Sequence, residues 1–196
     1  MANKPVSAII NQQPPPFNLS LSDDALVTFG APVGPGAVSF LDVGYMPVNE
    51  LTIAGDPLQL KGKLDGLFIQ YSGTGVQHFA ANGAPTTADF TSLHYDIVGY
   101  KGDATFDHAA DGSPRISDAK HLTVLAQGDL IMGQLAFNAG GGITGKLDAS
   151  LRIDGHVVGT LAISVQHPAG DIGPAMNGLT LTGGTLNATF TPLPMG

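Results

Sequence analysis

The chain has 196 residues, with 16 acidic and 8 basic side chains and a formal net charge of −8. Eight basic residues spread over the whole chain cannot form the positive surface that nucleic acid binding needs. Intrinsic disorder is also excluded, because hydrophobic residues make up 43% of the chain. The absence of cysteine excludes disulfides, thiolate metal sites and cysteine nucleophiles.

The first 36 residues predict an extended arm that is rich in proline and glycine. Pro14, Pro15 and Pro16 lack amide donors and favour an extended conformation. A second cluster of proline and glycine follows at residues 31–36. We expect the arm to lie over the domain surface or to be exchanged with a second subunit, which predicts a homodimer or higher oligomer.

No targeting or membrane segment is visible in the sequence. The apolar run Val6–Ile10 is shorter than the apolar core of a signal peptide, and no stretch reaches the length of a membrane helix. The low lysine content and the richness in glycine, threonine and asparagine are typical of exported bacterial β proteins. We therefore expect an extracellular or periplasmic location, with the cytoplasm as the alternative.

From residue 37 onward, apolar and polar side chains alternate with the period of a β-strand. The clearest run is Lys146–Ile153, and a second run follows at Val157–Val165. Asp154 and Gly155 lie between them, and an Asp-Gly pair in this position predicts a tight hairpin. Residues 117–128 could form a helix, but their alternation favours a strand. Helix elsewhere would amount to one turn at most.

This pattern predicts a single all-β domain at residues 37–196, with about eight to eleven strands. A half-apolar sheet must bury its face against a second sheet or against itself. An antiparallel β-barrel is preferred over a β-sandwich, because long strands interrupted by glycine suit the bends of a closed sheet. A short echo, Val-Gln-His at residues 76–78 and 165–167, suggests an internal duplication.

The richest polar segment is the strand at residues 91–100. His94, Asp96 and Tyr100 fall on one face of it, so the carboxylate could orient the imidazole and the phenol could bind a ligand oxygen. In a barrel interior these three would be catalytic acid–base residues. On an outer face they would be solvated polar groups. The predicted ligand-binding neighbours are Tyr71, His78 and Tyr95.

A calcium site is the main metal hypothesis. Asp103, Asp107 and Asp111 are spaced by four residues in an oxygen-rich loop, although the spacing is not that of an EF-hand. The alternative is an acidic, solvated turn. The six histidines lack the spacing of a ligand set, and we expect no cofactor.

Three functions remain open on this evidence. The first is a non-enzymatic exported β protein that binds a small apolar molecule or a partner, or serves as a structural subunit. The second is a small barrel enzyme of the cyclase, isomerase or hydratase type, because such enzymes need only an apolar cavity and one or two acid–base groups. The third is a metal or haem carrier. The first two differ in whether His94, Asp96 and Tyr100 point into the barrel.

Overall fold

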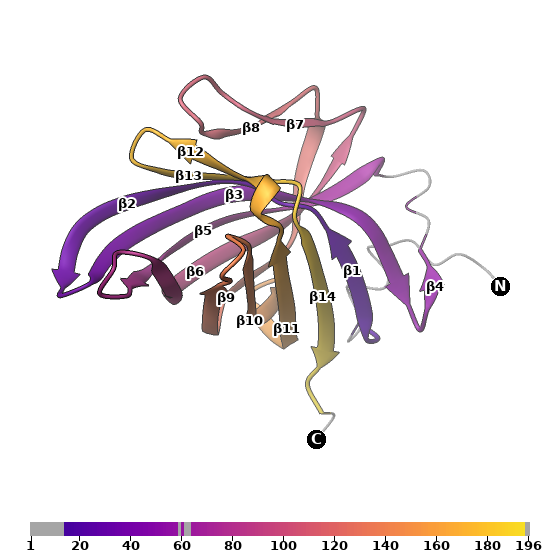
Figure 1. Ribbon diagram of the computed structural model, residues 1–196. Helices are drawn as coiled ribbons and strands as arrows, with labels where there is room; N and C mark the ends of the chain where they lie inside the picture. The colour runs from indigo at the N-terminus through magenta and orange to yellow at the C-terminus, as the bar shows by residue number, and fades with distance from the viewer. Residues whose placement is uncertain (1–13, 59, 61–63, 195–196) are drawn as a thin grey trace.

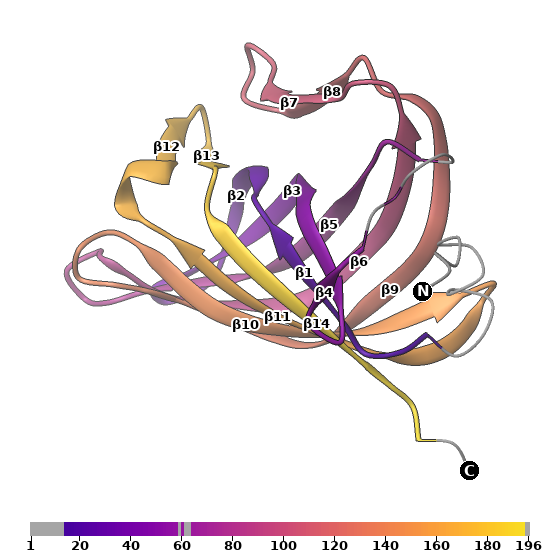
Figure 2. The ribbon, with the colours of Figure 1, turned by 90° about the vertical axis from the view of Figure 1, so that its right-hand side faces the viewer.

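The computed structural model describes residues 14–58, 60 and 64–194. Nearly all of them lie in strands, which confirms the all-β prediction and the preference for a barrel (Figures 1 and 2). Eight antiparallel strands close the barrel, namely β1 (Phe17–Leu21), β3 (Ala37–Ile53), β5 (Gly66–Phe79), β6 (Pro85–Lys101), β9 (Lys120–Phe137), β10 (Ile143–Ile153), β11 (His156–His167) and β14 (Thr185–Pro192).

The strand order around the barrel is β1-β14-β11-β10-β9-β6-β5-β3, and β3 pairs with β1 to close the ring. β3 has 17 residues, and its two halves have different partners along the same edge. Residues 37–45 pair with β2 (Asp24–Gly34), whereas residues 48–53 pair with β1. The sheet therefore splits at this edge, and β2 continues away from the barrel into β13 (Gly178–Thr182) and β12 (Ile172–Ala175).

The sequence placed residues 17–34 in the arm, whereas the structure has them in β1 and β2. Leu19 and Leu21 are buried on alternate positions of β1, and β1 pairs with β14 and with β3. This short strand is therefore the seam that closes the barrel. Residues 1–13 lie outside the described part of the chain.

Two local predictions are confirmed. β10 and β11 form a hairpin whose turn residues, Asp154 and Gly155, have φ values of 49° and 80°. Such positive φ values at both central positions are typical of a type I′ turn. Residues 120–137 form the strand β9 rather than a helix. A single 3-10 turn, η1 (Ala169–Asp171), follows β11 in the described residues.

A hairpin of β7 (Thr105–His108) and β8 (Pro114–Ser117) packs on the outer face of the barrel; the remaining short strand is β4 (Asp56–Pro57). Phe106 of this hairpin packs edge-on against Phe68, with ring centroids 5.6 Å apart, and lies beside Tyr45 and Tyr100. His108 Nε2 lies 3.2 Å from the carbonyl oxygen of Ala25 on β2. The hairpin thus reaches across β5 and β3 to the strand beyond them.

The interior is filled by inward side chains from all eight barrel strands. Tyr95 on β6 is 1% exposed and donates a hydrogen bond of 2.8 Å to the carbonyl oxygen of Ser150 on β10. Its ring crosses over Gly128, its register partner on β9, where a Cβ atom would collide with the ring and with Ser150. Tyr95 can span two strands only because Gly128 has no side chain.

The substitution Gly128→Ala is expected to lower the free energy of unfolding by about 1–3 kcal/mol, as overpacking of a well-filled core does. Urea denaturation followed by circular dichroism measures this loss. Gly140→Ala is the matched control, because nothing lies within 4 Å of a Cβ atom at that position. Equal stability of the two variants would show that the Tyr95 ring does not depend on the glycine.

Candidate functional site

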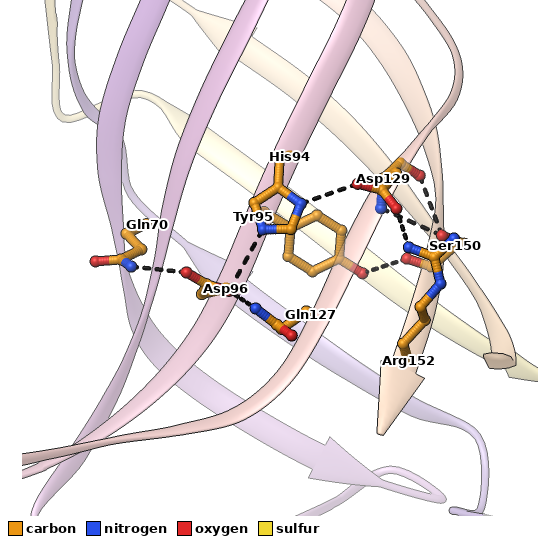
Figure 3. Close-up of polar contacts among 8 residues, drawn as sticks. All are labelled: Gln70, His94, Tyr95, Asp96, Gln127, Asp129, Ser150 and Arg152. Atoms are coloured by element: carbon orange, nitrogen blue, oxygen red, sulfur yellow. Dashed lines mark hydrogen bonds and ion pairs between the residues drawn. The ribbon is translucent and has the colours of Figure 1, made fainter. Parts of the chain in front are cut away.

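A polar network crosses the outer face of β5, β6 and β9 (Figure 3). The strand register places Ser72, His94 and Asp129 opposite one another on these three strands. His94 Nδ1 lies 2.9 Å from Asp129 Oδ1, and His94 Nε2 lies 3.6 Å from Asp96 Oδ1. The imidazole is therefore held between two carboxylates.

Both carboxylates have further partners. Asp96 accepts hydrogen bonds from the side-chain amides of Gln70, at 2.7 Å, and Gln127, at 2.6 Å. Asp129 forms an ion pair with Arg152 of β10. The side chain of His94 is 54% exposed, whereas that of Asp96 is 15% exposed. The network is thus a row of polar side chains with the imidazole on its solvent side.

This geometry differs from the expected one in the residue that orients His94. Asp96 shares the outer face with His94 as predicted, but Asp129 makes the shorter contact with the ring. Both ring nitrogens of His94 therefore face carboxylates. Among the described residues no hydrogen bond joins Ser72 to His94, so the row does not form a nucleophile–base pair.

An open groove of about 430 Å³ lies between this network and the β7–β8 hairpin. His94, Asp96 and Gln70 line one side of it, and Tyr45 and Pro114 are also among its lining residues. Its size falls within the range of small-molecule sites, and its polar groups are held by one another. The groove could accept a polar ligand.

The other predicted ligand-binding residues are divided between the two faces of the sheet. Tyr71 and Tyr95 point into the barrel and are 8% and 1% exposed. His78 forms an ion pair with Asp89 at 3.1 Å, with 42% of its side chain exposed. Tyr100 lies on the outer face beside Phe106, and burial, together with the nearby carboxylates of Asp103 and Asp65, raises the pKa of its phenol.

Of the three aspartates proposed for calcium, Asp103, Asp107 and Asp111, the last two have other partners. Asp107 accepts two hydrogen bonds from Arg115 across the β7–β8 hairpin, and Asp111 accepts from Ser113 in its turn. These bonds lower the pKa of both carboxyl groups. In the part of the chain that the structure describes, no three histidine or acidic side chains lie close enough together to hold a metal ion.

A second polar cluster lies inside the barrel. The Tyr71 hydroxyl is 3.1 Å from Asp23 Oδ1 and 3.3 Å from Asp42 Oδ1, and His167 Nε2 is 3.2 Å from Asp23 Oδ2. Asp23, Asp42 and His167 are 3%, 5% and 2% exposed. Burial and the charge of Asp23 raise the pKa of Asp42 well above its usual value. Burial, Asp23 and Asp42 raise the pKa of Tyr71 in the same way.

Sequence reasoning missed this cluster, although one signal was present. The alternation that buries Leu161, Ile163 and Val165 on β11 continues by two residues to His167, which is therefore an inward position. Likewise Asp42 follows Phe40 on the inward face of β3. An ionisable residue that continues an apolar face is the detectable signal for a buried polar group. Asp23 carries the same signal, because it continues the buried alternation of Leu19 and Leu21 by two residues.

At the other end of the interior, a pocket of about 60 Å³ opens at the mouth of the barrel. Every side chain that lines it is apolar. The lining residues are Pro14, Phe17, Leu19, Leu51, Ile53, Leu58, Leu67, Ile97, Leu125, Ala126, Leu151 and Ile153. They come mainly from six of the barrel strands, so the pocket follows the barrel axis. Barrel mouths are a common place for ligand sites.

The chain matches no protein-family model, and comparisons with curated proteins and with solved structures find no match. Among the described residues no helix has the length and apolar character needed to cross a membrane. The strand pairing alone defines the class of the protein, which is a closed, eight-stranded antiparallel β-barrel with extra strands.

The substitution His94→Ala is expected to lower the free energy of unfolding by less than about 1 kcal/mol, because the imidazole is more than half exposed. Chemical denaturation measures the change. His78→Ala is the matched control, since it removes a similar exposed pair with Asp89. A loss of several kcal/mol in His94→Ala alone would mean that the outer network carries much more of the fold than a surface ion pair does.

The raised pKa of Asp42 predicts how the free energy of unfolding depends on pH. Its pKa is raised in the folded state, so the folded protein keeps a proton that the unfolded chain releases above about pH 4. Stability should therefore fall by up to about 1.4 kcal/mol per pH unit, from about pH 4 up to the folded pKa. The free energy of unfolding of wild type minus that of Asp42→Asn isolates this effect. A difference that is flat or rises with pH would contradict it.

Proposed function

We propose that this protein is a non-enzymatic β-barrel that binds the alkyl end of an uncharged amphiphile in its apolar mouth pocket. The observation that carries the proposal is the lining of that pocket, which consists entirely of hydrocarbon side chains, mainly from six of the eight barrel strands. An apolar surface of this kind gains free energy when a hydrocarbon group replaces water.

The positions of the predicted acid–base residues also favour binding over catalysis. His94 and Asp96 lie on the outer face, and the middle of the barrel is filled by large side chains that include Tyr95, Ile69 and Leu161. A barrel enzyme of the expected type would instead have these polar groups around an interior apolar cavity.

The size of the pocket and the charge of the chain narrow the ligand class. A dry cavity of about 150 Å³ accommodates benzene. The present pocket, at about 60 Å³, holds a short alkyl end, and the rest of the ligand would extend through the mouth. The formal net charge of −8 disfavours anionic ligands, so an alcohol fits better than a carboxylate of the same chain length.

Calorimetric titration with 1-octanol tests the proposal, with octanoate as the charged comparison. The substitution Ala126→Leu places three more carbon atoms in the pocket and is expected to abolish octanol binding, while unfolding in urea confirms that the variant folds. Ala162→Leu is the control, because Ala162 points outward from β11. Unchanged octanol binding in Ala126→Leu would overturn the proposal.

A further inference from the structure

The buried cluster of Asp23, Asp42, Tyr71 and His167 joins four separate parts of the chain. Asp23 lies in the corner between β1 and β2, Asp42 on β3, Tyr71 on β5, and His167 at the end of β11. Buried ionisable groups are costly unless they satisfy one another. Their protonation can therefore be worked out from the contacts that they make.

The Tyr71 hydroxyl decides how the protons are arranged. It lies within hydrogen-bond distance of both carboxylates but has only one proton, so it can donate to only one of them. The other carboxyl group must then donate its own proton to the phenol oxygen. Asp23 also faces His167, whereas Asp42 is buried without a cationic partner. Asp42 is therefore the protonated acid, and Asp23 accepts from Tyr71.

The charge of the cluster gives the state of His167. Asp23 Oδ1 faces Tyr71, and Asp23 Oδ2 lies 3.2 Å from His167 Nε2. This contact has the distance of an ion pair but not the alignment of a hydrogen bond, so charge joins the ring to the Asp23 carboxylate. With His167 as an imidazolium and Asp42 as a neutral acid, the cluster has no net charge, as a buried site requires.

Two atoms of the cluster still lack a hydrogen bond. Among the described residues His167 Nδ1 and Nε2 are both buried without a hydrogen-bond partner, and Nε2 alone lies beside the Asp23 carboxylate as an ion pair. His167 lines a small cavity of about 20 Å³, as do Asp23, Asp42 and Tyr71. On this measure a cavity of about 10–15 Å³ holds one water molecule. The imidazolium would donate from Nδ1 to such a water.

We propose that Asp42, Tyr71, Asp23 and His167 form an internal acid–base site that binds one water molecule at His167 Nδ1. In this site Asp42 donates to Tyr71, and Tyr71 donates to Asp23. His167 forms an ion pair with Asp23 through Nε2 and donates to the water from Nδ1. The site is separate from the mouth pocket, because Tyr95, Ile69 and Leu161 fill the barrel between them.

Only these four groups titrate among the residues that line the cavity. The side chains that line the cavity from the other strands are all apolar: Met46, Phe90, Leu93, Leu135, Leu147, Val165, Leu181 and Leu186. Two further titratable groups close to the cluster are Asp24, whose pKa is raised chiefly by burial and also by Asp23, and His108, which faces Asp24 at 4.0 Å. Both lie outside the cavity lining.

The test compares two isosteric substitutions and one spectroscopic signal. Asp23→Asn is expected to raise the unfolding equilibrium constant at pH 7 at least tenfold, because it leaves the imidazolium without its carboxylate. Asp42→Asn should leave that constant unchanged or lower it, because the amide can donate to Tyr71 in place of the neutral acid and does not ionise in the unfolded chain. The imidazole ¹⁵N spectrum of wild type should show both nitrogens of His167 protonated at pH 7. A crystal structure should show one water within hydrogen-bond distance of Nδ1.

Three results would each overturn the site: a neutral His167 in wild type at pH 7, a cavity without a water at Nδ1, or equal effects of the two substitutions. If Asp23→Asn does not fold, that loss agrees with its expected effect, and the wild-type spectrum and crystal structure still decide the proposal. Tyr71→Phe provides a further check. It removes the link between the carboxyl groups and should alter the pH dependence that Asp42 causes without changing octanol binding.

Discussion

The barrel depends on the close approach of large inward rings to glycines on neighbouring strands. An eight-stranded barrel has an interior just wide enough for its own side chains. Tyr95 therefore crosses Gly128, and Tyr71 lies against Gly44, where a Cβ atom would be 2.8 Å from its ring. The ring of His167 likewise occupies the space of a side chain at Gly184. The glycine content of the sequence is thus largely a packing requirement.

These glycine contacts also place the polar groups. With Gly44 beneath it, Tyr71 extends its hydroxyl to Asp23 and Asp42, and the position of His167 over Gly184 sets its ring beside Asp23. The same sheet presents different chemistry on its two faces. Its outer face carries a solvated row of ion pairs, whereas its inner face carries a small cluster without net charge within a hydrocarbon interior. On β5, for example, Tyr71 belongs to the inner cluster, and the next residue, Ser72, lines the outer groove.

Most of the fold could be predicted because it depends on local alternation and turn chemistry. The barrel and the hairpin at Asp154 and Gly155 followed from these signals. The strands at residues 17–34 were missed because the proline and glycine clusters around them concealed a short alternation. The sequence also did not determine whether His94, Asp96 and Tyr100 point into the barrel, since the two faces of residues 91–100 both carry polar and apolar groups. Which face becomes the inner one depends on the direction in which the sheet curves.

The candidate sites were harder to predict because they depend on register between distant strands. Asp129 contacts His94 from a strand 35 residues away, and nothing near either residue indicates the pairing. The Val-Gln-His echo shows the same difficulty. His167 points inward at the end of β11, whereas His78 points outward at the end of β5, so the repeated letters occupy opposite faces. The echo is therefore not a structural repeat.

The seam between β1 and β14 joins residues from near the two ends of the described chain. Thr189 donates a hydrogen bond of 2.8 Å to Asn18 across 171 positions of sequence, and Phe17 stacks on Phe190. During synthesis on the ribosome, β1 emerges early and must wait for β14 before the ring can close. Contacts of such long range make folding slow. Until β14 is available, β1 and β11 each lack a strand partner on one edge, so the sheet stays open there.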